Sequence, residues 1–265
     1  MIACRDHYLK VYKVRAKKRF GQHFLRDSGI ISQIINALNP QPDECLVEIG
    51  PGLGAITKPL LERNPHLQVV EIDRDVIPTL LQLSPSLVIH EQDALTLDLT
   101  TFSQTPHSIR LIGNLPYNIS SPLLFHLLTQ AQLIDDMVFM LQKEVVDRIC
   151  AKPGDSDFGR LSVMIQYTCE VKLLFDVPPA CFSPPPKVMS AVMILKPHHV
   201  KPFVARDEKV FADLVRAAFS QRRKTLRNTL KEWVSETLWG ELGIDPSRRA
   251  QELGVEDFVR IANRL

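Results

Sequence analysis

The sequence predicts an α/β protein in which a doubly wound, Rossmann-like sheet precedes a small all-helical C-terminal domain. Short apolar runs, typical of buried strands, alternate with helical stretches between residues 45 and 195. The first run leads directly into a glycine-rich loop, VEIGPGLG at residues 47–54, as in nucleotide-binding βαβ units. Beyond residue 206 the strand signals stop and only helical patterns follow.

In the first half of the chain, helix and strand signals alternate. A helix over Ser28–Leu38, with Asp27 or Ser28 as its N-cap, precedes a buried strand over Cys45–Ile49. After these come a helix ending at residue 63, a strand over 67–73, a helix over 73–83, and strands over 87–91 and 109–112. Ser120 or Ser121 can N-cap the next helix, with Pro122 in its first turn.

The second half supplies the remaining strands and the helical domain. A fifth strand over 136–141 is followed by helices over Lys143–Cys150 and 161–169, and strands over 171–175 and 190–195 close the sheet. Five parallel strands with this closing pair make a mostly parallel sheet of seven strands. Helices are expected over 207–218, 222–234, 246–253 and 255–263, with Gly254 as the C-cap of the third.

Composition and charge bound the class of protein. A hydrophobic content of 45% and a charged content of 23% are typical of soluble globular proteins, and no apolar run is long enough to span a membrane. Five cysteines without a CxxC pair predict free thiols in a cytoplasmic protein, with no metal site. We expect a basic arm over 1–19, a sheet domain over 20–198 and a helical domain over 199–265, with no membrane contact and a monomeric chain.

Polar groups stand at the ends of successive predicted strands. The glycine loop satisfies GxGxxA, and Glu71 ends the second strand about 20 residues later, where a carboxylate can accept hydrogen bonds from ribose hydroxyls. Asp93 and Asn114 end the third and fourth strands. Because the carboxyl ends of parallel strands meet at one edge, these groups predict a site for a nucleotide-like cofactor. Each residue alone also fits a solvated strand end.

Two further features predict contact with a nucleic acid. Basic side chains gather at Lys10–Arg19 and again at Arg216–Lys231, as phosphate-binding surfaces do, although a solubilising face is the alternative. Prolines around Phe182 fix an extended loop that presents one aromatic ring, unless the loop is a plain connector. Tyr117 in the NLPY loop offers a second flat face.

Seven motifs stand in register along the chain: RFGQHFL at 19–25, VEIGPGLG at 47–54, VEID at 70–73, QDAL at 92–95, GNLPYNIS at 113–120, FSPPPKVMSAV at 182–192 and SQRRKTLRNTL at 220–230. Together they resemble the ribosomal RNA adenine N6-dimethyltransferase family, and the similarity extends over residues 17–265. Their order and form are most similar to the bacterial small-subunit branch of that family.

The resemblance implies a class I methyltransferase domain that uses S-adenosylmethionine and releases S-adenosylhomocysteine, without a metal. It implies that His23 and Leu25 cover the cofactor, and that Gly50 and Gly52 belong to its loop, with Gly50 against the methionine part. It further implies that Glu71 takes the ribose hydroxyls, that Asp93 reads the adenine and that Asn114 lies near the reactive methyl. Many family members carry Asn at the position of His23, whose side chain therefore has no role assigned by the resemblance.

The resemblance also implies a substrate: two adjacent adenosines in the 3′-terminal hairpin loop of small-subunit (16S) rRNA, methylated twice at N6 during ribosome biogenesis. The Asn114 side-chain oxygen and the Leu115 carbonyl would hold the amine, and Tyr117 and Phe182 would stack on the flipped base. Phosphate contacts would come from the residues Arg222, Arg223, Lys224 and Arg227.

Three alternatives remain at this point. GxGxxA with Glu71 also fits a dehydrogenase, although that function would leave the NLPY and Phe182 loops unexplained. A non-catalytic rRNA-binding assembly factor could share the same scaffold. A methyltransferase acting on adenine N6 of large-subunit rRNA is the third alternative, and the FSPPPKV and QRRKTLRN forms favour the small-subunit branch over it.

Overall fold

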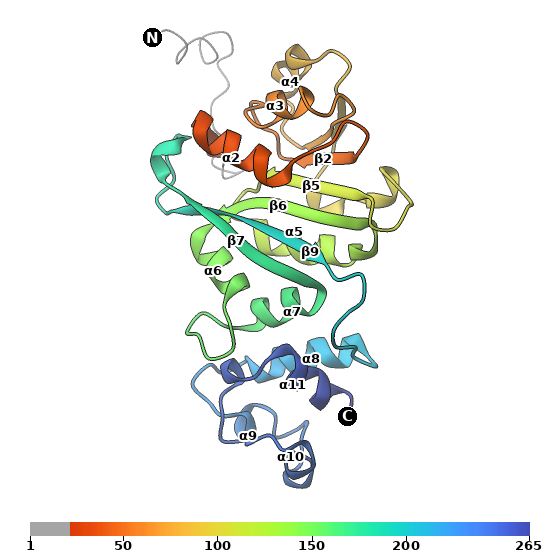
Figure 1. Ribbon diagram of the computed structural model, residues 1–265. Coiled ribbons are helices and arrows are strands. Elements are labelled where there is room, and N and C mark those ends of the chain that lie inside the picture. The colour runs from red at the N-terminus through yellow and green to blue at the C-terminus, as the bar shows by residue number, and fades with distance from the viewer. Residues whose placement is uncertain (1–21) are drawn as a thin grey trace. The chain divides into compact units, whose positions relative to one another are not determined.

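The computed structural model describes residues 22–265, and Figure 1 shows the arrangement of the elements. The predicted basic arm over 1–19 lies outside the described residues. Contacts divide the chain into two units. The first comprises the described residues up to Lys143 together with Leu173–Pro197, and the second comprises Glu144–Lys172 together with His198–Leu265. One boundary between the units lies between Pro197 and His198, but the contacts also group residues 144–172 with the C-terminal helices. The single domain boundary expected near residue 198 therefore stays a prediction.

A seven-stranded sheet in the order β4-β3-β2-β5-β6-β9-β7 confirms the predicted fold. The pairs from β4 to β6 are parallel, and β9 runs antiparallel to β6. The chain therefore reverses its strand order between β2 and β5, and at such a switch point a crevice opens at the carboxyl ends of the strands. The strands are β2 (Cys45–Ile49), β3 (Gln68–Glu71), β4 (Val88–Glu91), β5 (Ile109–Asn114), β6 (Ile134–Gln142), β7 (Cys169–Val177) and β9 (Ser190–Pro197).

Helices cover both faces of this sheet (Figure 1). One buried cluster joins side chains of α2, α3 and α4 to the same face of β2, β3, β5 and β6. Alternation along a strand sends the other buried side chains to the opposite face, where Figure 1 shows α5. The helices of this unit are α2 (Ser28–Leu38), α3 (Thr57–Leu61), α4 (Ile77–Leu83) and α5 (Ser120–Leu128), with short 3₁₀ turns η2 (Ala94–Thr96), η3 (Leu99–Thr101), η4 (Ala131–Leu133) and η5 (Pro179–Cys181).

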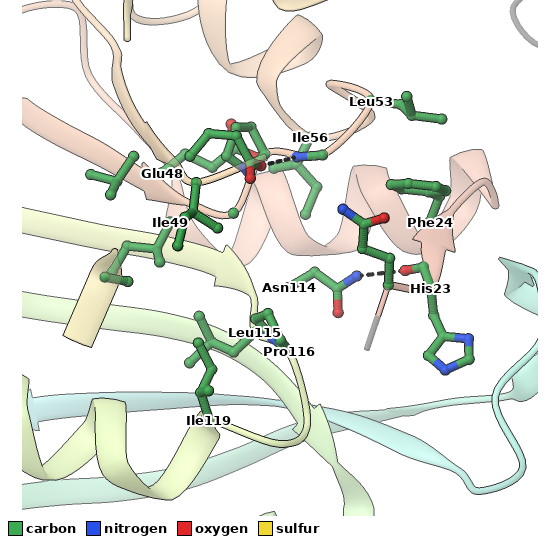
Figure 2. Close-up of a pocket in the computed structure, with 18 of the residues that line it drawn as sticks. His23, Phe24, Glu48, Ile49, Leu53, Ile56, Asn114, Leu115, Pro116 and Ile119 are labelled. Atoms are coloured by element: carbon green, nitrogen blue, oxygen red, sulfur yellow. Dashed lines mark hydrogen bonds between the residues drawn. The ribbon is translucent and has the colours of Figure 1, made fainter. Parts of the chain in front are cut away.

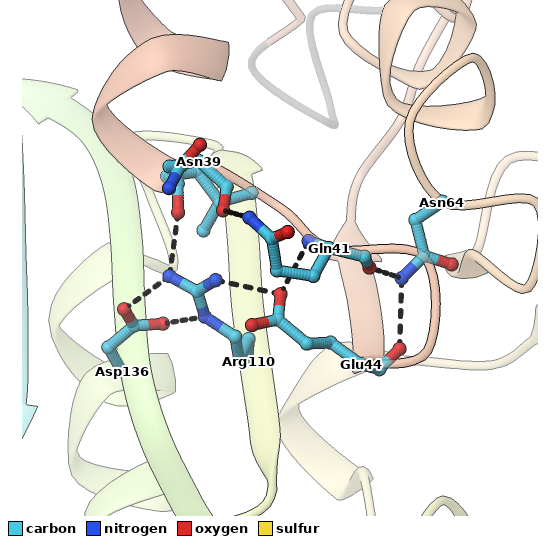
Figure 3. A network of polar contacts seen from close by, with 7 residues as sticks. Asn39, Gln41, Glu44, Asn64, Arg110 and Asp136 are labelled. Atoms are coloured by element: carbon cyan, nitrogen blue, oxygen red, sulfur yellow. Dashed lines mark hydrogen bonds and ion pairs between the residues drawn. The ribbon is translucent and has the colours of Figure 1, made fainter.

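At the end of the sheet opposite the crevice, a network of ion pairs and hydrogen bonds joins neighbouring elements (Figure 3). Arg110 on β5 donates two hydrogen bonds, of 2.9 and 2.7 Å, to Asp136 on β6. It also donates to Glu44 at 2.8 Å and to the carbonyl oxygen of Leu38 at 2.7 Å. One guanidinium thus joins the end of α2, the approach to β2, and strands β5 and β6. The planar fork of Arg suits such a many-partner site.

A small two-stranded sheet lies beside the crevice and was not expected from the sequence. Strand β1 (Phe24–Leu25) pairs antiparallel with β8 (Phe182–Ser183), with Leu25 opposite Phe182. The backbone N–H of Arg26 extends this contact by donating to the carbonyl oxygen of Cys181 at 2.8 Å. The FGQHFL segment and the proline-rich loop, far apart in the sequence, therefore form one local structure.

The second unit is helical and has its own buried core. Phe211, Leu214, Leu226, Trp239 and Phe258 are among the side chains of this core. Its helices are α6 (Lys143–Cys150), α7 (Arg160–Thr168), α8 (Glu208–Ala218), α9 (Leu226–Thr229), α10 (Glu236–Leu242) and α11 (Val255–Ala262), with the 3₁₀ turn η6 (Ala250–Glu252). Asp207 caps α8 by accepting from the backbone N–H groups of Lys209 and Val210. Among residues 22–265, no helix has the length and apolarity needed to cross a membrane.

Several predicted helix boundaries are wrong. The helix expected over 222–234 is reduced to α9, because residues 222–224 form a turn. The helix expected over 246–253 is absent apart from η6, since Asp245 accepts from the N–H of Ser247 and bends the chain there. Helix α10 was missed. Gly254 precedes α11 as its N-cap, with φ −80°, and is not a C-cap. Neither Ser120 nor Ser121 caps α5: the N-cap is Ile119, and Ser120 already lies inside the helix.

Candidate active site

A cavity of about 280 Å³ opens at the carboxyl ends of β2, β3, β4 and β5 (Figure 2). Segment 22–25 contributes further lining residues. Sequence reasoning placed the polar groups at this edge because parallel strands end there together. Of the residues predicted for the cofactor and for catalysis, the cavity brings together His23, Leu25, Gly50, Gly52, Glu71, Asp93, Asn114, Leu115 and Tyr117.

The glycine loop after β2 requires its glycines. Gly50, Gly52 and Gly54 have φ values of 69°, 55° and 82°, a region that side chains with a Cβ rarely adopt. A Cβ on Gly52 would also lie 3.2 Å from the ring of Phe24. At Gly50 and Gly52 the loop therefore presents only backbone atoms to the cavity, which allows a ligand to approach closely.

Glu71 holds its carboxylate at the end of β3 with two backbone hydrogen bonds. The N–H of Asp73 donates to one oxygen at 2.8 Å, and the N–H of Gly52 donates to the other at 3.3 Å. Burial raises the pKa of Glu71, while these N–H groups oppose that shift. Glu71 as a residue is 6% exposed, and its carboxylate links the glycine loop to β3, where a ligand's hydroxyl groups can donate to it.

Glu48 is a second buried acid at this cavity, and sequence reasoning missed it. The hydroxyl of Thr57 donates to Oε2 of Glu48 at 2.6 Å. Desolvation raises the pKa of Glu48 to about 8, and the nearby charge of Glu71 acts in the same direction. An acidic residue inside an apolar strand, VEI, was the available signal.

Asp93 is the N-cap of the 3₁₀ turn η2, which follows β4. Its Oδ1 accepts a hydrogen bond of 2.9 Å from the backbone N–H of Leu95, which fixes the side chain at the cavity. The carboxylate thus lies at the end of the cavity formed by β3 and β4, with Ile72 and Gln92 also in the lining.

Asn114 ends β5 with a defined amide orientation (Figure 2). Its Nδ2 donates to the carbonyl oxygen of His23 at 3.0 Å. Because a carbonyl oxygen only accepts, the amide nitrogen must face His23 and the side-chain oxygen must face away from it. The following N–H, of Leu115, donates to the carbonyl oxygen of Met140 at 3.1 Å and fixes the start of the NLPY loop.

Tyr117 is held at its tip and at its face. The hydroxyl lies 2.6 Å from the Oγ of Ser190, and the ring stacks on His23 with centroids 5.7 Å apart and an interplanar angle of 27°. Burial raises the pKa of Tyr117, and the hydrogen bond with Ser190 opposes that shift. Ser190 was not singled out in the sequence, although it lies within the FSPPPKVMSAV motif.

Phe182 does not present its ring at the cavity, so the expected exposed aromatic is wrong. The residue is 4% exposed and packs in the core cluster with Leu25, Ile56 and Val177. Pairing of β8 with β1 turns the ring inward, an effect of a long-range contact that the prolines alone do not reveal.

The predicted phosphate-binding residues lie in the second unit. Arg222, Arg223 and Lys224 occupy the exposed turn that follows α8, and no described residue pairs with their charges. Arg227 on α9 forms an ion pair with Glu236, with 3.0 Å between Nε and Oε1. The first three side chains are therefore the cations of this group that remain available for phosphates.

A family comparison decides the class of this site. Residues 13–265 match the family described as ribosomal RNA adenine dimethylase. The chain belongs to that family. It is similar to the ribosomal RNA small subunit methyltransferase A of Chromohalobacter salexigens, with 55% identity over 95% of this chain and 92% of the relative. The protein of the same name from Alcanivorax borkumensis is 54% identical over 94% of this chain and 90% of that relative.

Two solved structures of RNA-modifying enzymes have the same fold. A dimethyladenosine transferase from Plasmodium falciparum matches with a TM-score of 0.76 and 27% identity, over 90% of this chain and 96% of that one. The 23S rRNA methyltransferase ErmE matches with a TM-score of 0.71 and 25% identity, over 91% and 99% of the two chains. The chain is therefore an rRNA adenine methyltransferase, and the dehydrogenase alternative is wrong.

Proposed function

We propose that this enzyme dimethylates N6 of two adjacent adenosines in the 3′-terminal hairpin loop of 16S rRNA, on a small ribosomal subunit or its precursor in the cytoplasm. The observation that carries the proposal is the Asn114 amide, oriented by the His23 carbonyl beside the glycine loop and Glu71. The names of the bacterial relatives support the small-subunit substrate.

The residues of the cavity fit S-adenosylmethionine. The bare backbone at Gly50 and Gly52 leaves room for its methionine part, and the buried Glu71 carboxylate can accept from the ribose hydroxyls. Asp93 lies where an adenine amino group could donate to it. Segment 22–25, with His23 and Leu25, closes the cavity, and the backbone carbonyl oxygen of His23 contacts Asn114 there. When bound, the cofactor supplies a methyl group on a sulfonium, a carbon that an amine can attack without a metal.

Asn114 and Leu115 would hold the attacking amine. An adenine N6 is a poor nucleophile because its lone pair is delocalised into the ring. The Asn114 side-chain oxygen and the Leu115 carbonyl oxygen are two acceptors that can bind its N–H groups and favour a tetrahedral nitrogen. Their contribution is positioning and stabilisation of developing positive charge. Tyr117 offers the ring face on which the flipped base would stack.

The test uses labelled S-adenosylmethionine and small subunits that lack this modification, followed by nucleoside analysis. We expect N6,N6-dimethyladenosine at two adjacent positions of 16S rRNA. Label in large-subunit rRNA instead would show that the enzyme acts on 23S rRNA, the substrate given in the name of ErmE. Tight subunit binding without any methyl transfer would support the assembly-factor alternative and overturn the proposal.

A further inference from the structure

His23 is the residue at which three parts of the site meet. Its backbone carbonyl oxygen accepts from Nδ2 of Asn114, and its ring stacks on Tyr117. The ring nitrogen Nδ1 lies 2.8 Å from the carbonyl oxygen of Pro184, in the proline-rich loop. The backbone of His23 thus faces the catalytic amide, while its side chain faces the tyrosine and the loop.

The contact with Pro184 fixes the imidazole. A carbonyl oxygen accepts and never donates, so Nδ1 must carry the hydrogen in this contact. Rotation of the ring would break that hydrogen bond and the stack on Tyr117 together. The orientation of the ring is therefore set from two sides.

These contacts, together with that of Ser190, form one network around Tyr117. Ser190 holds the hydroxyl of Tyr117, and Ser190 is fully buried where it begins β9. Pro184 and Ser190 are the two ends of one short stretch, 184–190, of the FSPPPKVMS motif, in which Pro184, Pro185 and residues 187–189 are exposed. His23 therefore anchors the first end of this stretch and one face of Tyr117, while Ser190 anchors the other end and the ring's tip.

We propose that the side chain of His23 is a positioning residue for the target adenine. It holds Tyr117 and the stretch 184–190 in the geometry that receives the base, whereas only its backbone supports Asn114 at the methyl-transfer end. The proposal rests on the proposed rRNA substrate and adds to it a separation of roles. The side chain acts on the base, and the cofactor does not depend on it.

Three variants separate the two contacts of the ring. His23→Phe keeps an aromatic face but loses the donor to Pro184, and His23→Asn keeps a donor near the position of Nδ1 but loses the face. His23→Ala loses both. We expect kcat/KM for unmethylated small subunits to fall at least about tenfold in His23→Ala and less in the other two. The Kd for S-adenosylmethionine, measured by calorimetry, should stay within about twofold of the wild-type value in all three.

A second measurement does not depend on turnover. An rRNA hairpin with 2-aminopurine in place of a target adenosine should lose fluorescence when that base stacks on Tyr117, and less so in His23→Ala. Combining His23→Ala with Ser190→Ala tests this network, because both side chains contact Tyr117. We expect the double variant to lose much less activity than the product of the single losses, as for residues that act as a unit.

These experiments distinguish a failure of the positioning role of His23 from a failure of the proposed function. Wild-type protein that fails to methylate small subunits would overturn the function itself. Active wild-type protein with unchanged kcat/KM and unchanged quenching in a folded His23→Ala variant would overturn the positioning role. An equal loss of cofactor affinity would also overturn it, since the side chain would then serve the cofactor. If His23→Ala does not fold, the Asn and Phe variants decide by the same criteria.

Discussion

Asn114 combines two roles within one amide. Its nitrogen is engaged by the His23 carbonyl, which leaves the oxygen as an acceptor fixed in direction. We expect Asn114→Ala to lower the rate of methyl transfer by about 10²–10³, the usual cost of removing one fixed group that stabilises developing charge. The Kd for the cofactor should rise only a few-fold. Single-turnover kinetics and calorimetry measure the two effects separately.

Asn36→Ala is the control for this variant. Asn36 is an exposed amide on α2, outside the residues that line the cavity, and its side chain accepts a hydrogen bond from Arg63. Its removal should leave the rate and the cofactor affinity unchanged. Wild-type turnover in Asn114→Ala would show that the amide does not hold the attacking amine.

Glu48 makes stability depend on pH. Its pKa rises from the ordinary 4.5 to about 8 in the folded protein, because burial disfavours the charged form. The protonated carboxyl thus favours the folded state, and this stability is complete below pH 4.5 and is lost as pH rises through about 8. Glu48→Gln stays neutral and can still accept from the hydroxyl of Thr57.

The free energy of unfolding of wild type and of Glu48→Gln should therefore diverge between pH 5 and pH 9. We expect the wild type to lose several kcal/mol relative to the variant over this range, since each pKa unit corresponds to about 1.4 kcal/mol. Urea denaturation at fixed ionic strength gives the comparison. A difference that does not change with pH would mean that Glu48 ionises in the folded protein as it does in the unfolded chain.

At the scale of elements, Gly113 sets how closely β5 approaches β2. A Cβ at this position would lie 2.4 Å from the carbonyl oxygen of Ile49, a backbone atom that can move only with its strand. Gly113→Ala should therefore separate the two strands just before Asn114. We expect a loss of about 1–3 kcal/mol in stability, as for other overpacked sites, and a weaker cofactor affinity.

Gly240→Ala is the matched control. Gly240 lies inside helix α10, where a Cβ would meet no atom within 4 Å. The same substitution there should stabilise the protein by up to about 1 kcal/mol, because Ala favours helix more than Gly does. Denaturation of both variants measures the contrast, and equal effects would contradict the role given to the strand approach.

Local patterns predicted the strands of the sheet and the helices Ser28–Leu38 and Lys143–Cys150, because periodicity and strand-end polarity act within a few residues. Pairing between distant segments could not be predicted in this way. The inward ring of Phe182, the bond between Tyr117 and Ser190 and the stack on His23 all depend on contacts across 70 residues or more. The C-terminal helices were misjudged because the Asp245 turn and the exposed turn at 222–224 interrupt segments that read as continuously helical.

At the scale of the whole molecule, the cavity belongs to the first unit and the exposed basic turn to the second. Cofactor binding and rRNA binding should therefore respond to different substitutions. Arg222 and Arg223 lie in that turn, with no described carboxylate paired to them. Phosphate contacts release counterions, so each cation that binds a phosphate adds about 0.7–0.9 to the slope of log K against log salt.

The double variant Arg222→Ala/Arg223→Ala should thus weaken binding to small-subunit rRNA and reduce that slope by about 2. Its cofactor Kd should not change. Lys209→Ala/Arg264→Ala removes the same charge from the same unit, at cations already paired with Asp213 and Glu241, and should leave the slope nearly unchanged. Titrations of labelled rRNA at several salt concentrations measure both slopes. Equal reductions would show that the net charge of the unit, and not the 222–224 turn, determines its attraction to RNA.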